Sequence, residues 1–341
     1  MSLYPLKFDP IYKEKVWGGR TLEKIGRTLP GNSETKIGES WELVDLAATS
    51  VSGGGGGEER SVVTNGRLAG KTLNQLIKQF GKELIGDLPL TAGGNFPLLV
   101  KFLDARENLS VQVHPSQAYA DAHDQAHLKS EAWYVVEADP QGCIYKGIKQ
   151  GVTPQQFQQA IEEGNVEELM IKFPVKRGDC HYLPSGTCHA LGQGVLVAEV
   201  QTPSDTTFRV YDWGRQGREL HIQEAMACID FGPCNTDEDK RSHVAGMFTT
   251  ISRLVSCEYF IIERVRMCEG YEQEIPYDQP SIWMVIQGQG QVVLDDGSAT
   301  DFTRGETLLM PAKMDGAKVK FASDTVWLEV TFPKANDRQL A

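Results

Sequence analysis

Short runs of hydrophobic residues, many of them alternating with polar residues, recur along this 341-residue chain and are broken by Gly, Pro and Asp. Side chains two apart on a strand share a face, so each run predicts a half-buried or buried strand. Many short strands at close intervals are typical of a β-sandwich or barrel. The runs are PLLVKFLD, LSVQVHP, WYVVEAD, HYLPSG, VLVAEVQ, YFIIERVRM, IWMVIQGQGQVVLDDG and GETLLMPA.

Three segments carry features of helices instead. Residues 71–85 (KTLNQLIKQFGKELI) repeat apolar residues at helical spacing. Residues 153–170 begin with Thr-Pro, a favourable N-cap and first-turn pair, and residues 219–229 are a third candidate. The sequence therefore predicts a mainly β protein with a few inserted helices.

The pattern Gly-x5-Pro occurs twice, each time after a β-rich run. Residues 178–184 read GDCHYLP and residues 305–311 read GETLLMP. This repeat predicts two related β lobes, which we divide into residues 1–240 and residues 241–341. Only the first copy is followed by a histidine, so we expect the chemistry and any metal in the first lobe and no metal in the second.

Composition narrows the classes of partner and compartment. A formal net charge of -12 argues against broad contact with nucleic acid or an anionic membrane surface. No stretch approaches eighteen apolar residues, and no basic segment followed by an apolar core opens the chain, so we expect neither a membrane span nor a signal peptide. Seven scattered cysteines without a CxxC suit reduced thiols in the cytoplasm.

Five consecutive glycines, residues 53–57, predict a flexible surface loop. A phosphate-binding loop is disfavoured there, because no GK[ST] follows and no strand-to-helix pattern frames the run.

Gln112 and His114 alternate with two valines in LSVQVHP, so an amide and an imidazole share one face of a strand. Alternation alone leaves a solvent-exposed polar face as the simplest interpretation. Downstream, the string Gly-x5-Pro-x-Gly-x2-His ends at His189. It is similar to the second conserved motif of the cupin superfamily, in which that histidine binds metal.

A longer series of stretches, in order from about residue 15 to 231, resembles the type I phosphomannose isomerases in their shorter bacterial form. The resemblance implies two cupin-like lobes (double-stranded β-helices, or jelly rolls). It also implies a zinc enzyme that interconverts mannose 6-phosphate and fructose 6-phosphate through an enediol(ate). The stretches are KVWGG (15–19), IGESWEL (37–43), NGRLAGKTLNQL (65–76), FPLLVKFLDARENLSVQVHP (96–115), KSEAWYV (129–135), PSGTCHAL (184–191) and SDTTFRVYDWGR (204–215).

The resemblance implies one zinc ion per chain, bound by Gln112, His114, Glu131 and His189. Glu131 opens the apolar run AWYVVEA, where a carboxylate needs a partner. Structural zinc usually takes four protein ligands, often thiolates. Two neutral imidazoles, an amide and one carboxylate instead leave a charge of about +1, able to stabilise an anionic intermediate.

Three cations are candidates for substrate contact or catalysis. The resemblance places Arg209 at the active-site arginine, which can hold a developing negative oxygen; the alternatives are a surface arginine or an ion pair with Asp212. Lys101 lies within an apolar run, where desolvation would lower its pKa and make it a proton carrier. Lys129, at the K-x-E position of the family, is a candidate for binding the substrate phosphate; the alternative is a solvated loop residue.

Two features compete with or depart from this assignment. The stretch CHYLPSGTCH could form a zinc knuckle, but its spacing fits no common zinc finger. Longer family members have a histidine before the lysine, proposed to help open the sugar ring; here this position is Leu128 and His127 is displaced by one. The ring-opening group and the proton-transferring base therefore stay open. No metal-binding role is expected for His123, His127, His181, His221 and His243.

Two other functions remain as alternatives. One is a different metal-dependent cupin enzyme such as an oxygenase, although a glutamine and a carboxylate suit zinc better than redox iron. The other is a non-catalytic sugar-binding cupin, against which the intact ligand set and Arg209 argue. The sequence leaves the oligomeric state undetermined.

Overall fold

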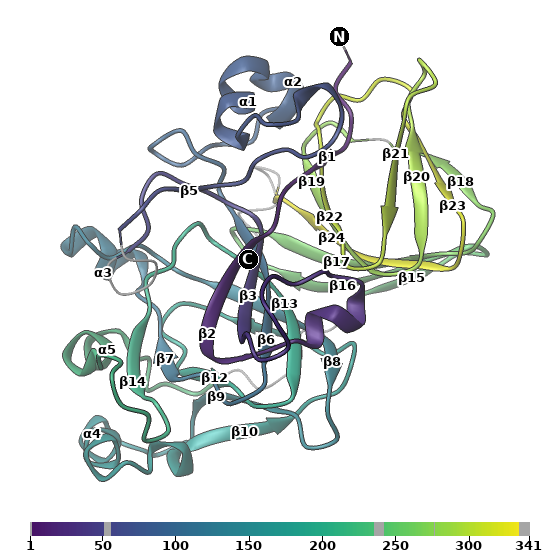
Figure 1. Ribbon diagram of the computed structural model, residues 1–341. Helices are drawn as coiled ribbons and strands as arrows, with labels where there is room; N and C mark the ends of the chain where they lie inside the picture. The colour runs from purple at the N-terminus through teal and green to yellow at the C-terminus, as the bar shows by residue number, and fades with distance from the viewer. Residues whose placement is uncertain (1, 51–55, 235–241, 276, 334–341) are drawn as a thin grey trace.

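The structure, a computed structural model, describes residues 2–50, 56–234, 242–275 and 277–333. Its antiparallel strands form two β lobes, with short helices at the edges (Figure 1). The predicted mainly β fold with a few helices is confirmed. Gly53, Gly54 and Gly55, most of the glycine run predicted to be a loop, lie outside the described residues.

The first lobe consists of two antiparallel sheets whose side chains meet in a shared core that includes Leu103, Trp133 and Leu191. One sheet has the order β11 (Cys180–Leu183), β8 (Glu131–Ala138), β13 (Val195–Gln201), β6 (Leu99–Ala105), β2 (Ile11–Gly19) and β3 (Ile37–Leu43). The other has the order β10 (Met170–Pro174), β9 (Cys143–Ile148), β12 (His189–Leu191), β7 (Val111–Val113) and β14 (Phe208–Tyr211). The strands predicted in this half of the chain are thus present.

The second lobe also has two antiparallel sheets. The larger has the order β1 (Leu6–Lys7), β22 (Thr307–Met310), β19 (Ser281–Gln287), β24 (Thr325–Thr331), β17 (Ile261–Met267), β16 (Thr249–Ser256) and β15 (His243–Ala245). The smaller has the order β18 (Glu272–Glu274), β23 (Lys318–Phe321), β20 (Gln289–Val293) and β21 (Ala299–Thr303). The long run IWMVIQGQGQVVLDDG is divided into β19 and β20 at Gly288, whose φ of 84° favours glycine.

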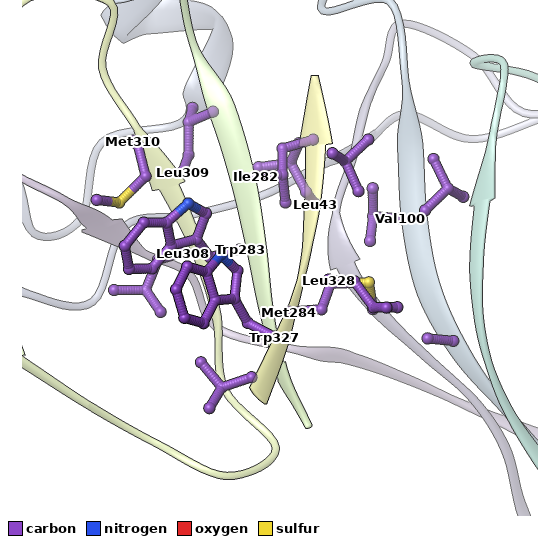
Figure 2. Packing of buried hydrophobic residues seen from close by; sticks show 14 of the residues in the cluster. Leu43, Val100, Ile282, Trp283, Met284, Leu308, Leu309, Met310, Trp327 and Leu328 are labelled. Atoms are coloured by element: carbon purple, nitrogen blue, oxygen red, sulfur yellow. The ribbon is translucent and has the colours of Figure 1, made fainter. Parts of the chain in front are cut away.

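The two lobes are joined more closely than a division at residue 240 suggests. β1, at the N-terminus, pairs with β22, so residues from the start of the chain complete the larger sheet of the second lobe. One hydrophobic core continues across the boundary, with Leu43 and Val100 close to Ile282 and Leu328 (Figure 2). The second lobe therefore packs directly against β3 and β6, which belong to the first lobe.

The helices follow their sequence signals with local changes. The predicted helix 71–85 is two helices, α1 (Leu73–Phe80) and α2 (Lys82–Ile85), because Gly81 between them adopts a φ of 48°. α4 (Pro154–Glu163) begins at the predicted Thr-Pro pair but ends at left-handed Gly164, before the predicted end at 170.

The remaining short elements complete the fold. α5 (Ile222–Cys228) lies within the third predicted helix, whereas α3 (Gln117–Ala122) was not predicted. The others are η1 (Thr21–Ile25), η2 (Gly66–Leu68), η3 (Val166–Leu169) and the pair β4 (Asp45–Leu46) and β5 (Glu59–Arg60). Among the described residues, no helix has the length and apolar character needed to cross a membrane.

Candidate metal centre and active-site cavity

The register of three neighbouring strands brings functional side chains together at β7. Gln112 lies directly opposite His189 on β12 and opposite Arg209 on β14. The flanking Val111 and Val113 are fully buried in a separate core that also includes residues of α4 and α5. The valines therefore anchor the strand on its helical side, while the amide and the imidazole face the interior of the lobe.

Glu131, the first residue of β8, reaches this group from the facing sheet. Its Oε1 lies 3.1 Å from Nε2 of His189, and its Oε2 lies 3.4 Å from Nε2 of His114. Nε2 of Gln112 lies 3.4 Å from Nε2 of His189. Within the described part of the chain, His114, Glu131 and His189 form the one group of three or more such residues whose ligand atoms all lie within 4.8 Å of one another.

Both histidines are oriented as metal ligands usually are. Nδ1 of His114 lies 3.0 Å from the carbonyl oxygen of Thr206, and Nδ1 of His189 lies 2.8 Å from that of Thr187. Each Nδ1–H therefore donates to a backbone carbonyl and leaves Nε2 as a lone pair directed at Glu131. Burial, reinforced by the ammonium of Lys129, lowers the pKa of His114 to about 3, so this imidazole stays neutral.

The same cluster leaves polar atoms without hydrogen-bond partners. Nε2 of His114 and Oε1 of Glu131 are buried and form no hydrogen bond, whereas Oε2 of Glu131 has an ion-pair contact with Lys129. Buried polar atoms are normally paired, and imidazole lone pairs that face a carboxylate repel it, so this arrangement suits a shared positive ion. Two imidazole nitrogens and a carboxylate suit a borderline divalent cation such as zinc. A half-turn of the Gln112 amide would direct its oxygen to the same point.

The alternative zinc knuckle is not assembled. Cys180 lies on β11, whereas Cys188 directly precedes β12 in the other sheet. Burial raises the pKa of the Cys188 thiol far above its usual value, which disfavours a thiolate ligand. The metal-compatible group among the described residues includes none of the cysteines and none of the five histidines expected to be uninvolved.

A buried lysine lies between two glutamates on the neighbouring sheet. Nζ of Lys101 is 3.1 Å from Oε1 of Glu199 and 3.7 Å from Oε2 of Glu39. The indole of Trp133 donates a 2.8 Å hydrogen bond to Glu199, and the indole of Trp41 donates a 2.7 Å bond to Glu39. Sequence analysis missed both carboxylates; the available signal was a glutamate inside each of the buried runs IGESWEL and VLVAEVQ.

The contacts among Lys101, Glu39 and Glu199 shift the pKa values of Lys101 and Glu199. Burial alone would lower the pKa of Lys101, but the carboxylates of Glu199 and Glu39 outweigh it and raise that pKa above its usual value. The expected lowering of the Lys101 pKa is therefore wrong, because the lysine is buried together with two partners. Burial and the nearby Glu131 raise the pKa of Glu199, against the opposing effect of Lys101.

Lys129 is buried rather than solvated. Its Nζ lies 2.8 Å from Oε2 of Glu131 and 3.9 Å from Oε1 of Glu199. The alternative of an exposed loop lysine is therefore wrong. Burial tends to raise the pKa of Glu131, but Lys129 holds it well below its usual value, so this carboxyl is an anion.

Arg209 is also buried, and neither alternative to the active-site role is found: it is not a surface arginine, and it forms no ion pair with Asp212. Its NH1 group donates to the carbonyl oxygen of Glu219, while its Nε has no hydrogen-bond partner. Asp212 instead pairs with Arg215 at 2.6 Å and with Arg218 at 3.0 Å. Arg209 thus keeps donor capacity for a ligand.

The three candidate cations, Glu199 and Gln112 line one cavity of about 480 Å³, within the usual range for a small-molecule site. His114, Glu131 and His189 are not among its lining residues. Its cations gather in a chain of net negative charge, as an anionic ligand requires. His127, considered as a group for ring opening, does not line it, and neither does Leu128. Residues that line the cavity include Trp17, Trp41, Lys101, Gln112, Lys129, Glu199, Arg209 and Arg218.

Comparisons with known proteins agree with this geometry. Residues 5–141 match the family model for phosphomannose isomerase type I, catalytic domain. The chain is 34% identical to mannose-6-phosphate isomerase ManA of Bacillus subtilis, over 91% of this chain and 94% of that relative. It is 36% identical to mannose-6-phosphate isomerase of Streptococcus mutans, over 90% and 92%. The crystal structure of mannose 6-phosphate isomerase from Bacillus subtilis matches with a TM-score of 0.83 and 30% identity, covering 97% of this chain and 100% of that chain.

Proposed function

The chain belongs to the type I phosphomannose isomerase family, and on this premise we propose that it interconverts mannose 6-phosphate and fructose 6-phosphate with one zinc ion bound. Gln112, His114, Glu131 and His189 would hold the ion. The observation that carries this proposal is the convergence of two buried imidazole nitrogens on the Glu131 carboxylate, with no hydrogen bond at Nε2 of His114 or Oε1 of Glu131. When bound, zinc supplies a Lewis acid that favours negative charge on the oxygens of the substrate.

The reaction requires a base that takes a proton from one carbon of the sugar and returns it to the neighbouring carbon. Glu199 lines the cavity, and its raised pKa suits proton transfer near neutral pH. Lys101 holds one oxygen of Glu199, and the Trp133 indole holds the other, which fixes the direction of the carboxyl. Lys101 would then act in catalysis as a fixed cation beside the base, and not as a proton carrier.

Arg209 and Lys129 are the proposed substrate-binding cations. Arg209 has an unpartnered Nε and a planar guanidinium that can hold two oxygens of the enediolate at once. Lys129 lines the cavity from the opposite sheet and presents its ammonium beside Glu131. Both are shielded from solvent, where electrostatic stabilisation of a developing anion is strongest.

The rest of the chain has supporting roles in this proposal. The described residues of 241–341, together with β1 from residues 1–240, form a second lobe that packs on the catalytic lobe through the shared core, and we expect this lobe to hold no metal. No disulfide joins any of the seven cysteines, which favours a reducing compartment and hence the cytoplasm. Substrate recognition requires a phosphosugar and neither nucleic acid nor membrane.

A coupled assay with mannose 6-phosphate, run with and without a chelator, tests the function. We expect turnover that the chelator abolishes and added zinc restores. Turnover that survives complete removal of metal would refute the zinc assignment while leaving the isomerase assignment intact. Absence of turnover in the zinc-loaded protein would favour the non-catalytic sugar-binding alternative.

A further inference from the structure

The chain after β14 makes a tight turn with an unexpected residue at its first central position. Among the described residues, Trp213 is the one residue other than glycine with a positive φ, 57°, and Gly214 after it has a φ of 76°. The backbone N–H of Arg215 donates to the carbonyl oxygen of Asp212 over 3.0 Å, which closes the turn. Two positive φ values within such a bond are typical of a type I′ turn, whose central residues are usually Asn or Gly. A tryptophan is strained there, so its surroundings have to hold it in place.

The indole of Trp213 provides this hold, because it ties the turn to the segment that leads into β7. Its Nε1–H donates to the carbonyl oxygen of Leu109 over 2.6 Å. Its ring contacts Tyr145 and Tyr211, each at a centroid distance of 5.5 Å. β7 and β14 are neighbours in the sheet (Figure 1). The turn is therefore fixed against the strand that carries Gln112.

The turn places a buried carboxylate that holds two arginines. Asp212, directly before Trp213, is 3% exposed. Its Oδ1 lies 2.6 Å from Arg215 and 3.0 Å from Arg218, and its Oδ2 lies 3.2 Å from Arg218. Within the described part of the chain, Asp212 is the one carboxylate that pairs with Arg218. The position of Arg218 thus depends on Asp212, and that of Asp212 depends on the turn.

Arg218 lines the first-lobe cavity together with Arg209. Burial, followed by the nearby charge of Arg218, lowers the pKa of Arg209 below its usual value. Burial also lowers the pKa of Arg218, although Asp212 opposes this effect. Arg209, Arg215 and Arg218 thus surround one buried carboxylate, which leaves this part of the site positively charged.

The lysines of the cavity, by contrast, each have a carboxylate partner of their own or share two. Their charges are therefore largely offset before a substrate enters. A guanidinium can also hold two phosphate oxygens at once, which an ammonium does less well. The arginine end of the cavity is therefore the better match for a phosphate. The lysine pairs are Lys13–Glu59, Lys15–Glu39, Lys101–Glu199 and Lys129–Glu131.

We propose that Trp213 is a positioning residue for substrate binding, which fixes Asp212 and thereby holds Arg218 where its guanidinium meets the phosphate of the substrate. The inference rests on the proposed function in taking a phosphosugar as the substrate. It adds Arg218 to Arg209 and Lys129 as a substrate-binding cation. Without the indole anchor, the strained turn would relax and Arg218 would move away from the phosphate.

D-Mannitol 1-phosphate is a suitable probe, because it carries the phosphate but has no carbonyl to isomerise. Calorimetry on the zinc-loaded protein measures its affinity. Arg218→Gln should weaken this affinity about tenfold or more, as for loss of a hydrogen bond between charged groups. Trp213→Phe keeps an aromatic ring but loses the N–H donor, and should weaken the affinity about three- to tenfold. The KM for mannose 6-phosphate should rise in parallel in both variants, with little change in kcat.

A double variant separates positioning from a general structural effect. Trp213→Phe/Arg218→Gln should bind mannitol 1-phosphate no more weakly than Arg218→Gln alone, because Trp213 acts through Arg218. Tyr211→Phe is the matched control, since it removes a hydroxyl from a ring that contacts Trp213 and keeps the indole bond. It should leave the affinity unchanged. If Trp213→Phe does not fold, Asp212→Asn tests the same link and should weaken the affinity in its place.

Three results would overturn the proposal. An unchanged affinity and KM in a folded Arg218→Gln variant would remove Arg218 from the phosphate. An unchanged affinity in folded Trp213→Phe, or a full additional loss in the double variant, would remove the positioning role of Trp213. Failure of the proposed function would look different, because the zinc-loaded parent protein would then lack turnover of mannose 6-phosphate whatever its affinity for mannitol 1-phosphate.

Discussion

Nζ of Lys129 lies 2.8 Å from Oε2 of Glu131, and both side chains are almost completely buried. This pair explains how a carboxylate can stay ionised at the bottom of the first lobe. Without the lysine, burial would favour the neutral acid, which binds a metal ion poorly. Lys129 therefore has two tasks in the proposed site, since it keeps Glu131 anionic and also lines the substrate cavity.

The first prediction concerns metal content. Purified protein made without chelator or added metal should carry about one zinc ion per chain, because one set of ligands is assembled in the described residues. His114→Ala should lose most of this metal, since it removes one of the two imidazole nitrogens. Elemental analysis of the dialysed proteins measures both quantities.

His123→Ala is the matched control for the metal prediction. His123 is exposed and stacks on Tyr119 outside the metal-compatible group, so its removal should not change the zinc content. Iron in place of zinc, or a His114→Ala variant with full occupancy, would contradict the assignment. A second ion located in residues 241–341 would contradict the expectation that the second lobe is free of metal.

Much of the fold and part of the site could be predicted because they depend on local pattern. The strand alternation at Gln112 and His114 gave their shared face, and the valines packed on the other side as alternation requires. The Thr-Pro pair at 153 gave the start of α4. The break at Gly81 depended on a backbone conformation that apolar spacing does not report.

Features that depend on pairing between distant segments were not predictable. Lys101 was expected to have a lowered pKa because its partners Glu39 and Glu199 lie on strands far away in sequence. The pairing of β1 with β22 likewise joins the two ends of the chain, and hydrophobic alternation does not specify which strands become neighbours. Asp212, considered only as an alternative partner of Arg209, pairs instead with two later arginines of its own loop.

The second prediction concerns what the buried group of Lys101, Glu39 and Glu199 contributes to the stability of the protein. Lys101→Met should lower the free energy of unfolding by about 3–5 kcal/mol, because it leaves Glu39 and Glu199 buried without their shared cation. Lys101→Met/Glu199→Gln should recover part of the loss, since one of the two buried charges is also removed. Urea unfolding followed by circular dichroism measures the difference.

Lys78→Met serves as the control for this series, because Lys78 is exposed on α1. Its effect should lie within about 0.5 kcal/mol, as for most surface substitutions. If Lys101→Met were as stable as Lys78→Met, or if the double variant were less stable than Lys101→Met, this prediction would be wrong. The charges of Lys101, Glu39 and Glu199 would then not contribute jointly to stability as their distances imply.

The third prediction separates the two substrate-binding cations. Arg209→Ala should lower kcat by ~10²–10³-fold with a smaller change in KM, as for removal of an oxyanion donor. Lys129→Ala should mainly raise KM at saturating zinc, if its contact with the substrate is equal in the ground and transition states. Steady-state kinetics with mannose 6-phosphate decide between them.

Zinc content has to be measured alongside these kinetics, because Lys129 also contacts Glu131. A large KM effect with unchanged kcat at Arg209 would reverse the two roles. Unchanged kinetics in both fully metallated variants would remove Arg209 and Lys129 from the site.

The fourth prediction concerns the pH dependence of stability, and Glu329 sets its sign. Burial raises the pKa of this carboxyl from 4.5 to about 7, so between these values the folded protein binds a proton that the unfolded chain has released. The contribution of Glu329 to stability is therefore fully present below about pH 4.5 and is lost as pH rises through 7. A shift from 4.5 to about 7 corresponds to a change of roughly 3 kcal/mol at most. Glu329→Gln cannot ionise, so it should gain stability relative to the parent protein as pH rises from 5.5 to 8. Urea unfolding of both proteins at these two pH values tests this difference, and an equal pH dependence of the two would mean that Glu329 is already ionised at pH 5.5.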